Sequence, residues 1–164
     1  MADYIIVCEL KGSENSNPVI LDSYPLDVED QISVKLVPKF LPFGSRAGDY
    51  LINRSGKNTI LSYIFKIENS DNRADLLSIS MVLGKKEKIE IYKLVLKEVI
   101  DKMGKNKLLT EEVLKENIKT IYQGVYDEKD ITIDFLKIEL SKIFAEAKSL
   151  YEIKKPKIKG SFSI

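Results

Sequence analysis

The chain has 164 residues, a net charge of +1 and an apolar fraction of 44%, which together are typical of a single soluble globular domain. The near-neutral charge gives no global field that would attract nucleic acid, and only three of the 26 basic residues are Arg, the residue that reads bases best. There is no His and only one Cys, which excludes an internal disulfide, the usual transition-metal sites and a serine triad in its usual form.

Two strands are expected at the start of the chain. Residues 4–10 form a near-continuous apolar run, typical of a central strand that is covered on both faces, and Cys8 within it is expected to be a small core residue. Residues 11–18 are rich in turn residues, so residues 19–24 are expected to return as a second strand, antiparallel to the first.

An irregular segment follows over residues 25–48. Pro25, Pro38 and Pro42 break any long helix, which leaves room for one short helix over residues 27–32. Aromatic and apolar side chains in such a segment either plug the edge of a core or form a recognition surface. The residues predicted to contact a partner are Tyr24, Leu36, Val37, Phe40, Leu41, Phe43 and Tyr50.

Three more strands are expected over residues 49–53, 59–68 and 75–83, separated by short polar turns. In the last of them, apolar residues at odd positions from 77 to 83 alternate with Ser78 and Ser80. This period of two predicts a sheet that is packed on one side.

The apolar period becomes helical from residue 88 onward. Gly104 is expected to stop the first helix, and Thr110 to cap the second. Asp130 or Thr132 is expected to cap the third, whose apolar face begins at Leu136. The prediction is an α+β fold in which a five-stranded antiparallel sheet carries about three C-terminal amphipathic helices. Residues 1–153 would form one domain, and residues 154–164 a flexible basic tail.

Catalytic, cofactor-binding and metal-binding residues are not expected. Gly56 and Lys57 lie in a hairpin turn without the spacing of a phosphate loop, and acid pairs such as Glu111 and Glu112 lie on polar helix faces among lysines. No apolar run approaches the ~20 residues of a spanning helix. We therefore expect a non-enzymatic cytoplasmic protein with at most peripheral membrane contact through its lysine clusters.

A family resemblance adds to this interpretation. The segments Ile20-Leu21-Asp22-Ser23-Tyr24-Pro25, Val37-Pro38-Lys39-Phe40-Leu41-Pro42-Phe43-Gly44 and Leu76-Leu77-Ser78-Ile79-Ser80-Met81-Val82 carry it. Over residues 4–103 the chain resembles a longin-type module, and more narrowly the upstream longin part of DENN proteins. The helices expected over residues 111–151 exceed the minimal longin pattern.

The resemblance implies a sheet of the longin or profilin type and a binding module that works in membrane traffic. Its partner would be a small GTPase or another longin-type or roadblock-type protein, with a homodimer as a further option and no cofactor. The alternative is a ligand-sensing domain of the PAS, GAF or profilin type, which predicts an internal small-molecule pocket beneath the sheet.

Overall fold

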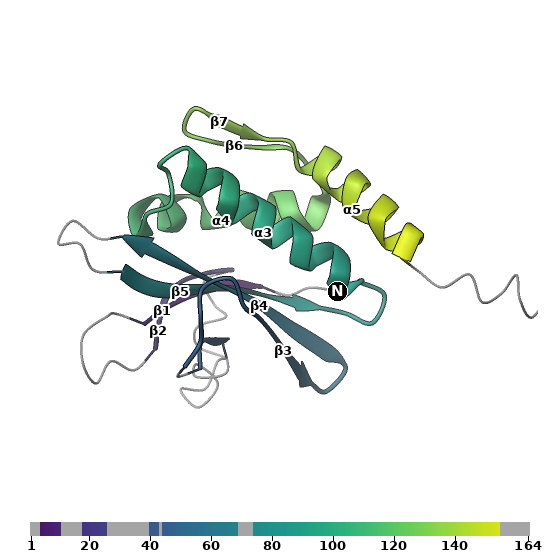
Figure 1. Cartoon of the computed structure of the whole chain (residues 1–164), viewed down its shortest axis with the longest axis horizontal. Coiled ribbons are helices and arrows are strands. Elements are labelled where there is room, and N and C mark those ends of the chain that lie inside the picture. The colour runs from purple at the N-terminus through teal and green to yellow at the C-terminus, as the bar shows by residue number, and fades with distance from the viewer. Residues whose placement is uncertain (1–3, 11–17, 26–39, 43, 69–73, 155–164) are drawn as a thin grey trace, which may run out of the picture.

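The structure of the chain is a computed structural model, and it describes residues 4–10, 18–25, 40–42, 44–68 and 74–154. It has the predicted α+β fold, in which an antiparallel sheet carries helices on one of its faces (Figure 1). The predicted short helix over residues 27–32 lies outside the described residues.

Five strands form the sheet, close to the predicted positions. They are β1 (Ile5–Leu10), β2 (Val19–Tyr24), β3 (Tyr50–Ser55), β4 (Asn58–Glu68) and β5 (Ala74–Leu83). Their order in space is β2-β1-β5-β4-β3, and every neighbouring pair is antiparallel. The predicted hairpin of the first two strands is confirmed, and β1 lies in the interior of the sheet.

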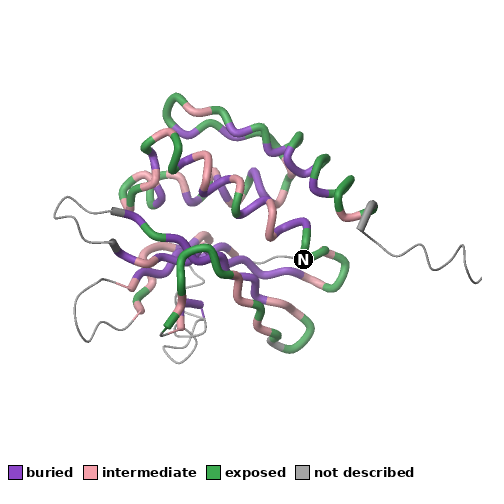
Figure 2. The backbone as a smooth tube through the Cα atoms, in the orientation of Figure 1, coloured by how far each residue is buried: buried purple, intermediate pink, exposed green. Residues whose placement is uncertain are grey.

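Both faces of the sheet are buried along its central strands, where Figure 2 shows much of the backbone in purple, the colour of buried residues. On the helix-covered face lie odd-numbered residues of β4 and β5 such as Phe65 and Ile79. On the opposite face a second apolar cluster joins Ile6 and Cys8 to Phe40 and Leu41. The prediction of a sheet packed on one side is therefore wrong.

Serine residues explain that error, because a polar side chain in a strand usually indicates an exposed face. Ser78 and Ser80 of β5 and Ser62 of β4 are all fully buried. The hydroxyls of Ser62 and Ser80 share a hydrogen bond of 2.6 Å across the strand pair, so each satisfies the other away from water.

Three long helices follow the sheet: α3 (Ile89–Lys105), α4 (Glu111–Asp127) and α5 (Leu140–Lys154). The predicted cap of α4 is confirmed, because Thr110 Oγ1 accepts a hydrogen bond of 3.2 Å from the Val113 amide. The predicted stop at Gly104 is wrong, since this glycine lies inside α3. The helix ends at Lys105, and the side-chain amide of its C-cap residue, Asn106, donates to the Lys102 carbonyl at 2.7 Å.

A small hairpin precedes α5, where the sequence predicts only helix. It consists of β6 (Ile131–Ile133) and β7 (Leu136–Ile138). Leu136 therefore lies in a strand, and Thr132 is a strand residue that caps no helix. Asp130 acts across the hairpin instead: its Oδ1 accepts hydrogen bonds from the Ser141 amide at 3.0 Å and the Ser141 hydroxyl at 2.6 Å. It thus satisfies an open donor in the first turn of α5.

The helix α5 packs on α3, on the side away from the sheet (Figure 1). The rings of Phe144 on α5 and Tyr92 on α3 meet edge to face at 5.5 Å, and Ile143 and Ala147 are buried beside them. Lys154, which the prediction assigned to the tail, still belongs to α5. Residues 155–164 lie outside the described residues.

The core draws on three strands and two of the helices. Ile6 of β1, Phe65 of β4, Ile79 of β5, Leu96 of α3 and Ile143 of α5 are all buried.

Two glycines in helices should respond in opposite ways to alanine. A Cβ at Gly124 of α4 would overlap the Ile131 side chain and lie 2.8 Å from Leu140 Cδ1, so Gly124→Ala should lower the free energy of unfolding by about 1 to 3 kcal/mol. At Gly104 the nearest atom outside α3 lies at 3.7 Å, so Gly104→Ala should raise stability by about 0.5 to 1 kcal/mol. Chemical denaturation measures the free energy of unfolding of both variants. Stabilisation by Gly124→Ala would show that α4 does not press on the hairpin as described.

The cap at Asp130 predicts a pH effect. Hydrogen bonds from the Ser141 hydroxyl and amide hold the pKa of Asp130 below its ordinary value. The stability that this carboxylate contributes is therefore present above the unfolded pKa of about 3.9 and is lost as pH falls through the lower folded pKa. Melting temperatures of the wild-type chain and of Asp130→Asn should differ at pH 7 and converge in acid. Asp134→Asn, on the same hairpin, is the control. A difference in melting temperature between the wild-type chain and Asp130→Asn that stays the same at every pH would contradict the cap.

Candidate functional site

The structure does not gather the predicted partner-contact residues in one place. Tyr24 ends β2 and Tyr50 begins β3, and these strands form opposite edges of the sheet. Phe40 and Leu41 lie under the face away from the helices. The other three predicted residues, Leu36, Val37 and Phe43, lie outside the described residues.

Phe40 and Leu41 plug the core. Both side chains have 0% exposure and pack with Ile6, Ile64 and Val82. Of the two interpretations of this segment, their placement favours the plug over a recognition surface.

Tyr24 serves the packing of α4 on the edge strand β2. Its ring meets that of Tyr122 edge to face at 4.9 Å, and Lys119 Nζ lies 5.9 Å from its centre. One edge of the sheet is thus partly covered by a helix.

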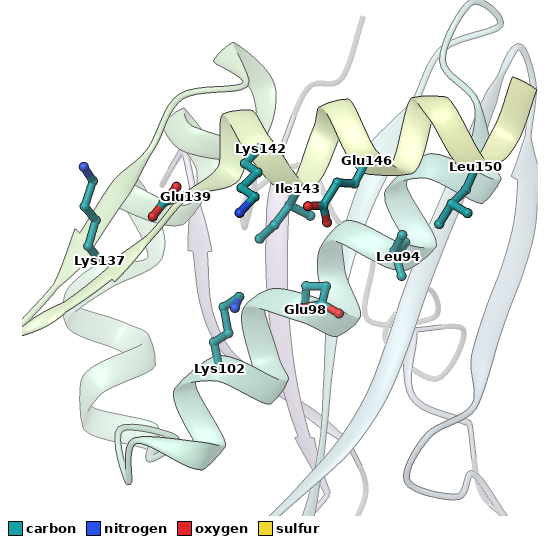
Figure 3. A pocket seen from close by; sticks show the side chains of 9 residues that line it. All are labelled: Leu94, Glu98, Lys102, Lys137, Glu139, Lys142, Ile143, Glu146 and Leu150. Carbon is teal, nitrogen blue, oxygen red and sulfur yellow. The ribbon is translucent and has the colours of Figure 1, made fainter.

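A groove with a volume of about 360 Å³ runs between α3 and α5 (Figure 3). Its apolar members are Leu94, Ile143 and Leu150, and its charged members are Glu98, Lys102, Lys137, Glu139, Lys142 and Glu146. The sequence interpretation assigned none of these residues to a binding site.

The edge strand β3 presents unpaired backbone. It pairs with β4 on one side, and within the described part of the chain no strand pairs with its other side. Ile64 of β4 exchanges hydrogen bonds with the chain at Gly48 and Asp49, at 2.7 and 2.9 Å. Because antiparallel pairs alternate, the peptide groups of Tyr50, Ile52 and Arg54 then point away from β4.

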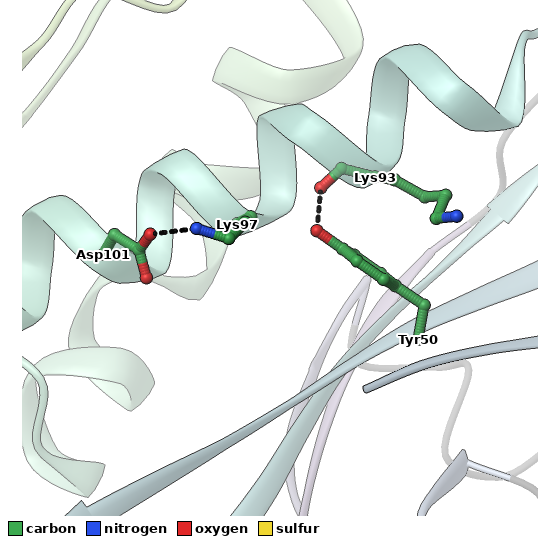
Figure 4. Close-up of polar contacts among 4 residues, drawn as sticks. All are labelled: Tyr50, Lys93, Lys97 and Asp101. Atoms are coloured by element: carbon green, nitrogen blue, oxygen red, sulfur yellow. Dashed lines mark hydrogen bonds and ion pairs between the residues drawn. The ribbon is translucent and has the colours of Figure 1, made fainter. Parts of the chain in front are cut away.

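Side chains of α3 lie close to this edge (Figure 4). The Tyr50 hydroxyl donates to the Lys93 carbonyl at 3.1 Å, and Lys93 Nζ lies 4.9 Å from the centre of the Tyr50 ring. Lys97 pairs with Asp101 at 2.8 Å on the same face of α3. Burial, and next the neighbouring Tyr63, raise the pKa of Tyr50, so its hydroxyl is protonated and can donate at neutral pH.

An open hollow of about 370 Å³ continues from this edge along α3. Tyr63, Phe65 and Ile100 form its apolar part, and Lys66 and Asp101 are among its charged residues. The outward peptide groups, the exposed Ile52 side chain and this hollow together make the edge of β3 a composite surface, which is both polar and apolar.

Three carboxylates also meet beneath the start of α4, and the sequence interpretation missed this group. The ligand atoms of Glu9, Asp75 and Glu111 lie within 4.8 Å of one another, and the first two residues are buried. Carboxylate oxygens are what hard divalent cations prefer, so among the described residues these three could hold one. The available signal was the charge of Glu9 and Asp75 at inward positions of apolar strands.

The thiol of Cys8 offers no reactive centre. Burial raises its pKa to about 12. It therefore stays protonated at neutral pH, and a protonated thiol is a poor nucleophile.

Comparison with known proteins gives no family. The chain matches no protein-family model and has no significant match among curated proteins. Among the described helices, none is both long and apolar enough to cross a membrane.

The plug at Leu41 makes a prediction about stability. Leu41→Ser removes a fully buried apolar side chain and places a hydroxyl among Ile6, Phe40 and Val82, so it should lower the free energy of unfolding by about 2 to 5 kcal/mol. Urea denaturation measures it, with Phe135→Ser, at a side chain that is 74% exposed, as the control. A loss no larger than in the control would show that residue 41 is a surface residue.

Proposed function

We propose that this protein is a non-enzymatic, longin-like binding module, a scaffold that acts through protein–protein contacts made at the β3 edge. The observation that carries the proposal is the row of outward peptide groups at Tyr50, Ile52 and Arg54. An exposed strand edge is a ready template for a strand from another chain, and main-chain hydrogen bonds then supply affinity.

The two edges of the sheet differ, and the difference favours β3. The pairing of β2 with β1 contains an irregularity opposite Val7 and Cys8, and α4 packs against β2. The pairing of β3 with β4 is regular over its whole length. Irregular pairing and a covering helix both discourage strand addition, so β3 is the better docking edge.

Side chains near β3 give the added strand specificity. Ile52 is 46% exposed and offers an apolar contact in the middle of the strand. Tyr50, two residues earlier on the same strand, contacts α3 at the Lys93 carbonyl, and the ion pair of Lys97 with Asp101 lies on that helix. A partner with one apolar side chain opposite Ile52 and polar groups toward α3 would complement this surface.

The class of partner follows from the resemblance to longin modules. We propose a small GTPase or another longin-type or roadblock-type protein, and a second copy of this chain is a further candidate for the same edge. Nucleic acid is not proposed, because the net charge is +1.

A ligand-sensing domain is the alternative function, and it requires a pocket within the sheet–helix core. The two hollows described here both open to solvent at the surface of α3. The inward positions of β4 and β5 are instead filled by packed side chains such as Leu61 and Met81. No specific observation therefore favours the alternative.

The decisive experiment substitutes Ile52 by lysine. A charge at the centre of the docking edge should weaken association by about 1 to 2 kcal/mol, while the domain stays folded because Ile52 is nearly half exposed. Binding to a panel of small GTPases loaded with GDP or a GTP analogue, and self-association by sedimentation, are the measurements.

The matched control is Val19→Lys. Val19 is 52% exposed and lies on the opposite edge strand, so this variant makes the same chemical change at β2. Loss of binding in Ile52→Lys alone supports the proposal. Equal effects of both variants, or no association with any GTPase and none with itself, would overturn it.

A further inference from the structure

The groove between α3 and α5 has two chemically different ends. The two helices run in opposite directions along it, so that Lys102 faces Lys142 at one end and Leu94 faces Leu150 at the other (Figure 3). Glu98 and Glu146 lie next to the leucines. One end therefore carries positive charge, and the other joins negative charge to apolar surface.

Within the described residues, no ion pair joins two charges of the groove. The ion pairs of α3 and α5 are Lys93 with Glu90, Lys97 with Asp101, and Lys148 with Glu128, and all of them lie outside the groove. Among the described residues, neither Glu98 nor Glu146 has an ion-pair partner. Two carboxylates beside exposed apolar surface fit an occupant that is both basic and apolar.

A segment of that chemistry follows α5 directly. Residues 155–164 read Lys-Pro-Lys-Ile-Lys-Gly-Ser-Phe-Ser-Ile. They contain three lysines and three large apolar residues, with no acid, and the lysines come first. The segment thus starts at the C-terminal end of α5, which is also the acidic end of the groove.

The segment is long enough to return along the groove. The part of α5 that lines it from Lys142 to Leu150 spans about 12 Å. An extended chain covers about 3.3 Å per residue, so the ten residues after Lys154 reach about 33 Å. Pro156 cannot continue a helix and permits a change of direction after α5.

We propose that residues 155–164 dock in cis into the groove between α3 and α5, with their lysines against Glu98 and Glu146 and Ile158 on Leu94 and Leu150. This inference goes beyond the proposed function and involves a different face of the molecule, so either stands if the other fails. The docked segment would cover apolar surface that includes Leu150, which is 48% exposed.

Paramagnetic broadening in the full-length chain tests the docking. A nitroxide is attached to Ser161→Cys, and the native Cys8 does not compete because it is buried and its pKa is raised to about 12. The proposal expects loss of amide signal intensity at Leu94, Glu98 and Glu146. Signals of Glu116 and Gln123, on the exposed side of α4, should keep their intensity.

A charge reversal supplies the matched comparison. Glu98→Lys combined with Glu146→Lys replaces attraction by repulsion and should lower the docking equilibrium constant by about tenfold, so that signals along the groove recover. Glu112→Lys with Glu116→Lys makes the same change in net charge on α4 and should leave the broadening intact. Higher salt should also weaken docking, because it screens the attraction between the lysines and the two carboxylates, so signals along the groove should recover.

Mixing isotopes identifies the occupant. One chain carries the nitroxide at natural isotope abundance, and it is mixed with a ¹⁵N-labelled chain that carries no nitroxide. In this mixture only contacts between copies can broaden the observed signals, and the proposal expects no broadening. Broadening in the mixture would assign the groove to the segment of a second copy and overturn docking in cis. Absence of broadening in the groove, or broadening that survives the groove charge reversal, would also overturn it.

Discussion

The pairing of β1 with β5 is the contact on which the rest of the fold depends. The strands β1 and β2 form one local hairpin, and β3, β4 and β5 form a local meander. Among the described strands, only the ladder from Ile5 opposite Met81 to Leu10 opposite Leu76 joins these two units into one sheet. It closes a loop of many residues, so its entropic cost must be offset by burial on both faces of β1.

The sequence of β1 supplies that burial. Ile5 and Val7 pack under the helices, whereas Ile6 and Cys8 face the cluster on the other side. All four are essentially inaccessible to water. This explains why a continuous apolar run, rather than an alternating one, was a sound basis for placing β1 in the centre of the sheet.

Sequence patterns predicted the elements that have long repeats and the caps that depend on neighbouring residues. They failed for the elements whose structure is determined by a tertiary contact. The strand β5 and the helices α3 and α4 have long repeats, and a cap such as Thr110 depends on its own neighbours. The hairpin of β6 and β7 has strands of three residues each, too short for a period of two to be recognised, and Leu136 also falls at helical spacing from Leu140. Asp130 caps α5 only because the hairpin brings the two together.

The candidate site was harder to predict than the fold, because it depends on strand order. Tyr24 and Tyr50 stand at the two ends of the expected binding segment, and the order of the strands separates them to opposite edges of the sheet. Nothing in either tyrosine's neighbourhood in the sequence specifies which edge a helix will cover. The position of α4 over β2, seen only in three dimensions, leaves β3 as the edge with regular, outward peptide groups, and Ile52 is an exposed apolar residue on that edge.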